Sequence, residues 1–428
     1  MAHLTLLFLT LFSLFSNTFL NQVYASSPKP KALVLPIRQD AATKLLVANI
    51  YGRTPLIPVK FVVDLTARHL WANCETDYTS STFSQPKCSS AQCKTARTSY
   101  CFNNCQGARP FCHTNTCGYL LENPISHQST IGELAQDVFA FSSTNGLNPG
   151  PLVRIRDYLF TCAPSALVEL RLPKGVQGVA GLAHSPIALQ NVLASKTGIK
   201  PIFTMCISST TSADGVIFFG SDGPYSFLPG IDVSQNLRYT PLTISPFDEY
   251  YVNVKSIKIN QKLVPGLNTS LLSVKDTGSG GGTVFNTLLP YTILEDSIFK
   301  AITSFFAKQL SKVPQVKPIA PFGLCYESKH FSSTRLGPGV PSIDLEMEGK
   351  DAVWSIFGLN SMVEAQPGVL CLAFVNGKNE YRAKVNIGTY QMQDIPLKFD
   401  LSKQMLGFGG PLSGIRTHCE NFNFTTAA

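Results

Sequence analysis

The stretch FVVDLTARHLW (61–71) decides the fold, because it places one carboxylate, Asp64, directly after a run of apolar residues. Farther along, GVAGL (178–182) forms an apolar run framed by glycine. In the second half of the chain, VNIG (385–388) repeats that shape. A strand, an acidic turn and a second apolar strand ending at glycine, occurring twice, indicate an internal duplication.

The length and composition fit a large globular β protein. The 428 residues are 44% hydrophobic and only 14% charged, which excludes a disordered chain, and the length favours about two units. Short apolar runs bounded by Gly, Pro, Asn or Asp dominate and predict strands, among them 251–259 and 397–407. Helical spacing occurs only at 298–310 and, more weakly, at 187–193. The expected fold class is therefore all-β with a few short helices.

The N-terminus has the pattern of a secretory signal peptide. An apolar run from Leu4 to Phe15 is followed by polar residues and by Val-Tyr-Ala at 23–25, so residues 1–25 are expected to be cleaved. No later stretch approaches the ~18 apolar residues of a membrane span, so a secreted protein is expected. Two sequons, at Asn268 and Asn423, are expected glycosylation sites on this route.

The twelve cysteines favour disulfides over a metal site. An even number in an oxidising compartment favours six disulfides, and no CxxC pair supports a zinc cluster. Nine of the twelve lie up to Cys206 and three lie beyond it, so full pairing requires at least one disulfide between the halves. No metal ion and no cofactor is expected.

The net charge of +8, from 35 Lys and Arg against 27 Asp and Glu, is dispersed along the chain. A nucleic-acid surface normally shows clustered basic residues interleaved with aromatic ones, so nucleic acid is not an expected partner. Attraction to acidic cell-wall polysaccharide or acidic proteins is one interpretation of this charge. Ordinary solvated surface charge explains it equally well.

Several sequence words occur in an order that is typical of one family. Among them are VVDLTARHLWANCE (62–75), GVQGVAGLAHSPIALQ (175–190), STRLGPGVPSIDL (333–345) and CENFNFT (419–425). The chain resembles the plant branch of the pepsin-like aspartic proteases. That group contains basic 7S globulin, the extracellular dermal glycoproteins and the inhibitors of fungal xylanases and xyloglucan-specific endoglucanases.

This resemblance implies a two-lobed, all-β, pepsin-like fold secreted to the plant apoplast, with lobes at about 31–233 and 234–419. It also implies two disulfides, Cys325–Cys371 and Cys206–Cys419, of which the second would join the halves. The pairing within 74–162 stays open.

The catalytic turns of that family are incomplete here. Its chemistry needs two carboxylates about 3 Å apart that share one proton. Asp64 is present, but Leu65 replaces the hydroxyl residue of the Asp-Thr/Ser-Gly turn and Thr66 replaces its glycine. In the second turn, GGTVFNTLL (281–289) places Asn286 where the second Asp belongs. Asn cannot share the proton, so Asp64 and Asn286 are expected to be a vestigial pair and no catalytic residue is expected.

Two further segments bear on proteolysis. The tetrapeptide DTGS that begins at Asp276 spells the protease turn, but Lys275 precedes it and glycines follow, which is typical of an exposed loop. In active plant members a flap tyrosine lies about eight residues before a glycine, and counting back from Gly132 selects Pro124, which has no hydroxyl. Proteolysis is therefore not expected, and a residual aspartic endopeptidase using Asp276 with Asp64 is the third interpretation.

The inhibitor branch of the family acts through loop side chains. Members similar to xyloglucan-endoglucanase inhibitors carry one arginine in a Ser-Thr-Arg-Leu-Gly-Pro loop and one just before the last cysteine, and Arg335 and Arg416 stand there. A guanidinium can pair bidentately with the paired carboxylates of a glycoside hydrolase cleft. Without the family, both would be read as ordinary surface arginines. The xylanase-inhibiting branch uses a histidine in the C-terminal loop, and because His418 adjoins Cys419 here, xylanase is a less favoured target.

The sequence therefore predicts a proteolytically inactive inhibitor of secreted microbial glycoside hydrolases of the xyloglucan-specific endoglucanase type. Its expected partner is a fungal endoglucanase, and its expected role is plant defence. The alternative is a seed or cell-wall storage globulin that resembles basic 7S globulin and binds a peptide ligand.

Overall fold

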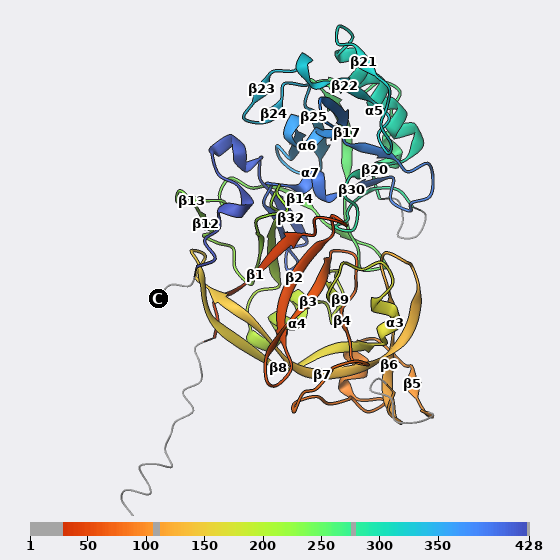
Figure 1. The fold of residues 1–428 in the computed structure, drawn as a ribbon, viewed down its shortest axis with the longest axis vertical. Helices are drawn as coiled ribbons and strands as arrows, with labels where there is room; N and C mark the ends of the chain where they lie inside the picture. The colour runs from red at the N-terminus through yellow and green to blue at the C-terminus, as the bar shows by residue number, and fades with distance from the viewer. Residues whose placement is uncertain (1–28, 106–111, 275–279, 426–428) are drawn as a thin grey trace, which may run out of the picture.

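A computed structural model of the chain describes residues 29–105, 112–274 and 280–425, and Figure 1 shows how its elements are arranged. The expected signal peptide, 1–25, lies outside these residues. The structure is mostly β with a few short helices, so the predicted fold class is confirmed. Within the described ranges, no helix is long and apolar enough to cross a membrane.

The first half of the chain consists mainly of long strands. Its elements are β1 (Ala32–Gln39), β2 (Leu46–Gly52), β3 (Ile57–Asp64), β4 (Leu70–Asn73), α2 (Ala91–Thr95), β5 (Cys101–Phe102), β6 (Thr116–Glu122), β7 (Ser129–Thr144), β8 (Pro149–Ala163), α3 (Ser165–Val168), β9 (Val176–Gly181), α4 (Leu189–Thr197), β10 (Ile202–Cys206), β11 (Gly215–Phe219), β12 (Ser226–Phe227) and β13 (Ile231–Asp232).

The second half has shorter strands and, among the residues that the structure describes, the longest helix. Its elements are β14 (Arg238–Pro241), β15 (Thr243–Ile244), β16 (Tyr250–Val252), β17 (Val254–Ile259), β18 (Lys262–Leu263), η1 (Thr269–Leu271), β19 (Thr283–Phe285), β20 (Thr292–Leu294), α5 (Asp296–Gln309), β21 (Gln315–Val316), β22 (Cys325–Glu327), η2 (Ser328–His330), β23 (Ser333–Thr334), β24 (Gly337–Pro338), β25 (Ile343–Met347), β26 (Val353–Ile356), α6 (Gly358–Ser361), β27 (Met362–Gln366), β28 (Val369–Leu372), β29 (Phe374–Asn376), β30 (Val385–Ile387), α7 (Thr389–Met392), β31 (Leu397–Asp400), β32 (Met405–Phe408), η3 (Leu412–Ile415) and η4 (Cys419–Asn421).

The largest sheet joins strands from both ends of the chain. Its 14 strands follow the order β14-β32-β31-β10-β11-β1-β2-β3-β9-β4-β8-β7-β6-β5. β31 pairs antiparallel with β10, with Leu397 opposite Met205 and Asp400 opposite Ile202. This sheet therefore contains strands from both of the predicted lobes, 31–233 and 234–419. These lobe limits stay a prediction.

The internal duplication appears as two matched pairs of parallel strands. In the first half, β3 pairs parallel with β9, and Asp64 lies opposite Gly181. In the second half, β19 pairs parallel with β30 within a six-stranded sheet, β15-β16-β19-β30-β20-β29. Each pair brings an apolar strand and its following turn beside a second apolar strand, which is the arrangement expected from the repeated motif.

A shared apolar core holds the two halves together. The rings of Phe203 on β10 and Phe399 on β31 are stacked with centroids 4.6 Å apart, and Tyr250 of β16 lies 5.1 Å from Phe399. All three side chains are buried. Burying one such side chain stabilises the fold by roughly 1.5–3 kcal/mol, so contacts of this kind resist separation of the halves.

All twelve cysteines are paired. Cys206–Cys419 spans the two halves and, with Cys325–Cys371, is one of the two pairs that the family resemblance implied. The pairing left open within 74–162 consists of Cys74–Cys162, Cys88–Cys101, Cys93–Cys117 and Cys105–Cys112.

The predicted helices form, with one change of limits. The stripe at 298–310 lies on α5, which buries Ile298, Ile302 and Phe306 and is capped by the Glu295 carboxylate. The helix predicted at 187–193 runs instead from 189 to 197, because Gly198 ends it in a left-handed conformation with φ 75°. The strand predicted at 251–259 is divided into β16 and β17, and 397–407 forms the β31–β32 pair.

Candidate functional site

A cleft of about 580 Å³ is lined by residues from both halves of the chain. Asp64 and Asn286 both line it, together with apolar side chains that include Trp71, Phe247 and Tyr381. The two residues named as a vestigial pair are therefore brought to one site. Asp276 lies outside the described residues.

Asp64 and Asn286 follow equivalent strands. Asp64 ends β3, and its carbonyl accepts a hydrogen bond of 2.8 Å from the Leu182 N–H beyond β9. Asn286 follows β19, and its N–H donates to the Ile387 carbonyl of β30 at 2.9 Å. Each side chain is thus set at the end of an apolar strand by pairing with a parallel neighbour.

The two turns are braced from one side only. The Thr287 hydroxyl accepts a hydrogen bond from the Leu65 N–H at 3.0 Å and donates to the Val63 carbonyl at 3.2 Å. A hydroxyl at the matching position of the first turn could make the reciprocal bonds, but that position is Leu65, whose buried side chain is aliphatic. The second turn therefore supports the first without a return contact of this kind.

Asp64 is a buried carboxyl in a polar turn. Its Oδ1 accepts hydrogen bonds from the Thr66 N–H and the Thr66 hydroxyl, both at 2.7 Å. Burial raises the pKa of Asp64 to about 6, and the Thr66 hydrogen bonds partly oppose that rise. The carboxamide oxygen of Asn286 accepts from the Leu288 N–H at 2.9 Å. A carboxamide can donate or accept hydrogen bonds, but it does not exchange a proton as a second carboxyl would.

Sequence reasoning missed His69, which also lines the cleft. Its ring is buried, and neither ring nitrogen has a hydrogen-bond partner among the described residues. Burial, helped by the neighbouring Arg68, lowers the pKa of His69 to about 3, so the ring is neutral at ordinary pH. It packs edge-on against Tyr119 of β6, with centroids 4.5 Å apart. His69 lies within the stretch 61–71, but that stretch carries no signal for its burial.

Sequence reasoning also missed an ion pair beside the cleft. The Arg68 Nη2 lies 2.6 Å from Asp248 Oδ2, and Arg97 lies 3.9 Å from the same carboxylate. Asp248 is buried and belongs to the turn between β15 and β16, so the contact links the first half to the second. Nothing in the sequence could have found it, because 180 residues separate Arg68 from Asp248.

The β6–β7 hairpin forms part of the lining of the cleft. Pro124, selected by the sequence count, lies in its turn and lines the cleft. Tyr119 and Leu120 on β6 line it as well. The hairpin therefore carries a tyrosine at position 119. The count from Gly132 selects position 124 instead and does not find it.

The two predicted inhibitory arginines lie on adjacent exposed loops. Arg335 lies between β23 and β24, and Arg416 directly follows η3. Arg335 Nη1 donates to the Gly414 carbonyl at 3.5 Å. Figure 1 shows the C-terminal segment beside β23 and β24.

Buried contacts hold the Arg416 loop at both ends. The Asp394 carbonyl accepts from the Leu412 N–H at 2.8 Å, and its carboxylate accepts from the Cys419 N–H at 2.8 Å. The same carboxylate contacts His418 Nδ1 at 3.1 Å. His418 therefore faces the buried Asp394 at the base of the loop, whereas Arg416 lies exposed at its tip.

The two predicted glycosylation sites differ in exposure. Asn268 is exposed and precedes the short helix η1, where its side chain accepts from the Ser270 N–H at 3.2 Å. Asn423 is half-buried, and its Oδ1 accepts from the Thr425 hydroxyl at 2.6 Å. Both stay predictions.

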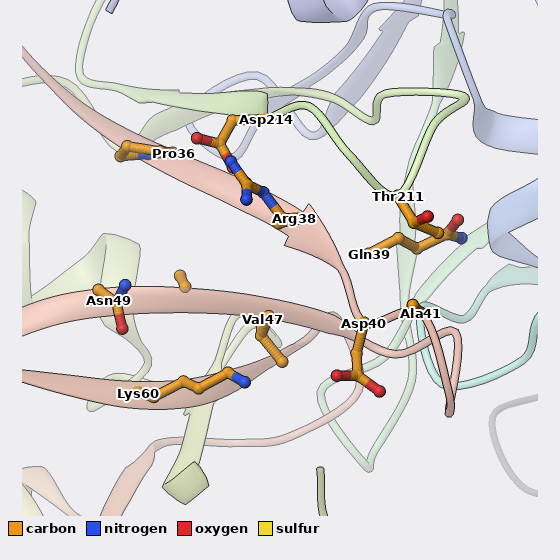
Figure 2. A pocket seen from close by; sticks show the side chains of 11 residues that line it. Pro36, Arg38, Gln39, Asp40, Ala41, Val47, Asn49, Lys60, Thr211 and Asp214 are labelled. Carbon is orange, nitrogen blue, oxygen red and sulfur yellow. The ribbon is translucent and has the colours of Figure 1, made fainter. Parts of the chain in front are cut away.

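A second hollow, of about 430 Å³, lies along β1 and β2. In Figure 2, Arg38 and Asp214 point toward each other on one side of it, and Asp40 and Lys60 lie on the other. The first two form an ion pair of 2.7 Å. None of the predicted site residues lines this hollow.

In the part of the chain that the structure describes, no group of three His, Cys, Asp or Glu side chains could hold a metal ion.

Comparisons with known proteins found related families, sequences and structures. The family profile described as "Xylanase inhibitor N-terminal" matches residues 47–221, and "Xylanase inhibitor C-terminal" matches residues 249–410. Gamma conglutin 1 of Prunus dulcis is 47% identical over 403 residues, which cover 94% of this chain and 91% of the relative. "Probable aspartic proteinase GIP2" of Nicotiana benthamiana is 43% identical over 417 residues, 94% of each chain. The crystal structure of edgp superposes with a TM-score of 0.90 at 44% identity, covering 93% of this chain and 99% of that one.

Proposed function

Because the chain belongs to the pepsin-like xylanase-inhibitor family, we propose that it inhibits a secreted microbial glycoside hydrolase and does not hydrolyse peptides. The proposed target is a fungal endoglucanase of the xyloglucan-specific type, met in the plant apoplast during defence. Secretion is supported by the six disulfides, which form in oxidising compartments.

The observation that carries this proposal is the juxtaposition of Arg335 and Arg416 on two braced, exposed loops. Glycoside hydrolase clefts carry two carboxylates on either side of the scissile bond. Guanidinium groups presented by adjacent loops can pair with such carboxylates and occupy the space of the substrate. Loops that are already held in place lose little entropy on binding, which favours affinity.

The proposal is tested by titrating the purified protein against a panel of xyloglucanases and xylanases. We expect inhibition of at least one xyloglucanase, and Arg335→Ala or Arg416→Ala to weaken it by about 10-fold to 100-fold, since an unpaired buried carboxylate typically costs 2 kcal/mol or more. Arg171→Ala is the matched control, because Arg171 is also exposed and has a similar left-handed backbone, φ 63° against 62° for Arg416. If no hydrolase is inhibited, the proposal is wrong. If inhibition survives both substitutions, only the site assignment is wrong.

The absence of proteolysis is proposed from the cleft. Asp64 faces a cleft whose second turn offers Asn286, and Leu65 provides no hydroxyl to brace the opposite turn. The relative named a probable aspartic proteinase makes endopeptidase activity the competing hypothesis. Acid-pH cleavage of a protein substrate that pepstatin blocks and Asp64→Ala abolishes would establish the competing hypothesis.

A second candidate function is peptide binding by a storage globulin similar to basic 7S globulin. The observation in its favour is the apolar rim of the cleft, where Leu120 is 61% exposed, Phe247 48% and Tyr381 37%. Exposed apolar side chains around a groove suit an extended peptide. A pull-down with a seed peptide tests this function. Capture of the peptide by the wild type and by Arg416→Ala, but not by Phe247→Ser, would support it.

A further inference from the structure

The exposed tip of the Arg416 loop contains an apolar residue. Leu412, Ser413 and Thr417 are buried, whereas the three residues between them, 414–416, are exposed. Ile415 is 52% exposed in spite of its aliphatic side chain. An isolated exposed isoleucine needs no explanation, but this one stands on a tip whose flanking residues are all anchored.

Two neighbouring segments extend the surface around Ile415. On one side, Arg335 reaches the Gly414 carbonyl. On the other, the Thr417 hydroxyl donates to the Leu228 carbonyl at 2.6 Å, and the Leu228 side chain is 60% exposed. The tip therefore brings two arginines together with Ile415, which precedes Arg416 in the chain, and with Leu228, whose carbonyl is bonded to Thr417. We call Arg335, Ile415, Arg416 and Leu228 the docking tip.

Rigidity separates the docking tip from an ordinary mobile loop. Cys206–Cys419 and the carboxylate of Asp394 fix its C-terminal end, and the Asp394 carbonyl fixes its N-terminal end through Leu412. Arg416 itself caps η3 in a left-handed conformation, with its N–H bonded to the Leu412 and Ser413 carbonyls. A non-glycine residue is strained in that conformation and is retained only where surrounding contacts enforce it.

We infer that Ile415 is a contact residue of the inhibitory interface, packing on the apolar wall of the hydrolase cleft while Arg335 and Arg416 pair with its carboxylates. The inference rests on the proposed function. Substrate clefts are lined mainly by apolar and aromatic side chains with a few polar groups among them. A partner that matches the docking tip is therefore an acidic cleft with an apolar wall. The net positive charge of this chain, +8, favours such an acidic partner over a second copy of itself.

The experiment compares inhibition constants of Ile415→Ala and Ile415→Asp with the wild type, against the xyloglucanase that the wild type inhibits. We expect about 10-fold weaker inhibition for Ile415→Ala, which corresponds to about 1.4 kcal/mol. Ile415→Asp is expected to weaken inhibition by about 100-fold, because it adds repulsion from the carboxylates of the cleft. Leu228→Ser, at the edge of the docking tip, is expected to have a smaller effect than Ile415→Ala.

The matched control is Ile57→Asp, because Ile57 is the same residue type, is 38% exposed and lies on β3 away from both loops. Melting temperatures of all variants show whether they fold. Folded Ile415 variants that inhibit like the wild type, while Arg416→Ala loses inhibition, would overturn this inference and leave the proposed function intact. A wild-type dimer that Ile415→Asp dissociates would also overturn it, since the tip would then be covered by a second copy. Failure of the wild type to inhibit any hydrolase would remove the proposed function as well.

Discussion

Replacement of Asp64 by Asn tests the electrostatics of the cleft. Asp64 is 1% exposed, and burial raises its pKa from the ordinary 3.8 to about 6. Because its folded-state pKa lies above the unfolded value, Asp64 costs almost no stability at pH 3 and below, where it is mostly protonated in both states. As the pH rises from about 4 to 6 the unfolded chain gains stability from ionisation that the folded protein cannot match.

The size of this cost follows from the two pKa values. The difference between about 6 and 3.8 corresponds to about 3 kcal/mol of lost stability above pH 6. Asn has the same shape and keeps an oxygen that can accept from the Thr66 N–H and hydroxyl, as Asp64 does now. Asp64→Asn should therefore raise the free energy of unfolding by about 3 kcal/mol at pH 8 and leave it nearly unchanged at pH 3.

Urea unfolding of the disulfide-intact protein at pH 3 and pH 8 measures both differences. Asp400→Asn is a control of opposite sign, because hydrogen bonds from Ser402 and Lys403 outweigh burial and hold the pKa of Asp400 below its ordinary value. Asp400→Asn should lower the free energy of unfolding at pH 8. This decrease should become smaller as the pH falls through the lowered pKa of Asp400. If Asp64→Asn is less stable than the wild type at pH 8, or gains equally at pH 3, the reasoning about Asp64 is refuted.

Three further predictions concern other parts of the molecule. Replacing Cys206 and Cys419 by Ser should lower the free energy of unfolding by about 2–5 kcal/mol, measured by urea unfolding, because the disulfide joins residues 213 positions apart. Asn286→Asp should restore a second carboxylate yet show no cleavage of a peptide substrate at acid pH, since Leu65 still offers no bracing hydroxyl; efficient cleavage would contradict this. Asn268→Gln should reduce the mass of the plant-expressed protein by one glycan in mass spectrometry, and an unchanged mass would exclude glycosylation there.

Features that depend on neighbouring residues could be predicted from the sequence. The helix α5 was placed within two residues because the spacing of Ile298, Ile302 and Phe306 carries the helical period. Asn286 is predicted to be the partner of Asp64 because the family resemblance aligns GGTVFNTLL (281–289) with the second catalytic turn, and both residues line the cleft. The mostly β fold class therefore follows from local patterns, whereas the two turns of the candidate site follow from the resemblance.

Contacts between distant residues cannot be predicted from local patterns. The Cys206–Cys419 disulfide, which joins residues 213 positions apart, is predicted only because the cysteine count requires a bond between the halves and the family resemblance implies this pair. The Arg68–Asp248 pair joins residues 180 positions apart, and no periodicity links them. The contact between Arg335 and Gly414 spans 79 positions, so the sequence showed two arginines but not that their loops touch. Tyr119 was missed for a different reason, since counting from Gly132 presumes a hairpin of fixed length.

The cleft and the docking tip are separate sites, and this separation bears on how the two candidate functions relate. None of Arg335, Ile415 and Arg416 lines the cleft that contains Asp64. A peptide in the cleft would therefore leave the docking tip uncovered, and a hydrolase bound at the tip would leave Asp64 untouched. If the chain both binds a peptide and inhibits a hydrolase, the two affinities should be independent unless one ligand changes the geometry of the other site. Hydrolase inhibition that stays constant as peptide is added would show two independent functions on one scaffold, whereas competition would mean that the hydrolase reaches into the cleft.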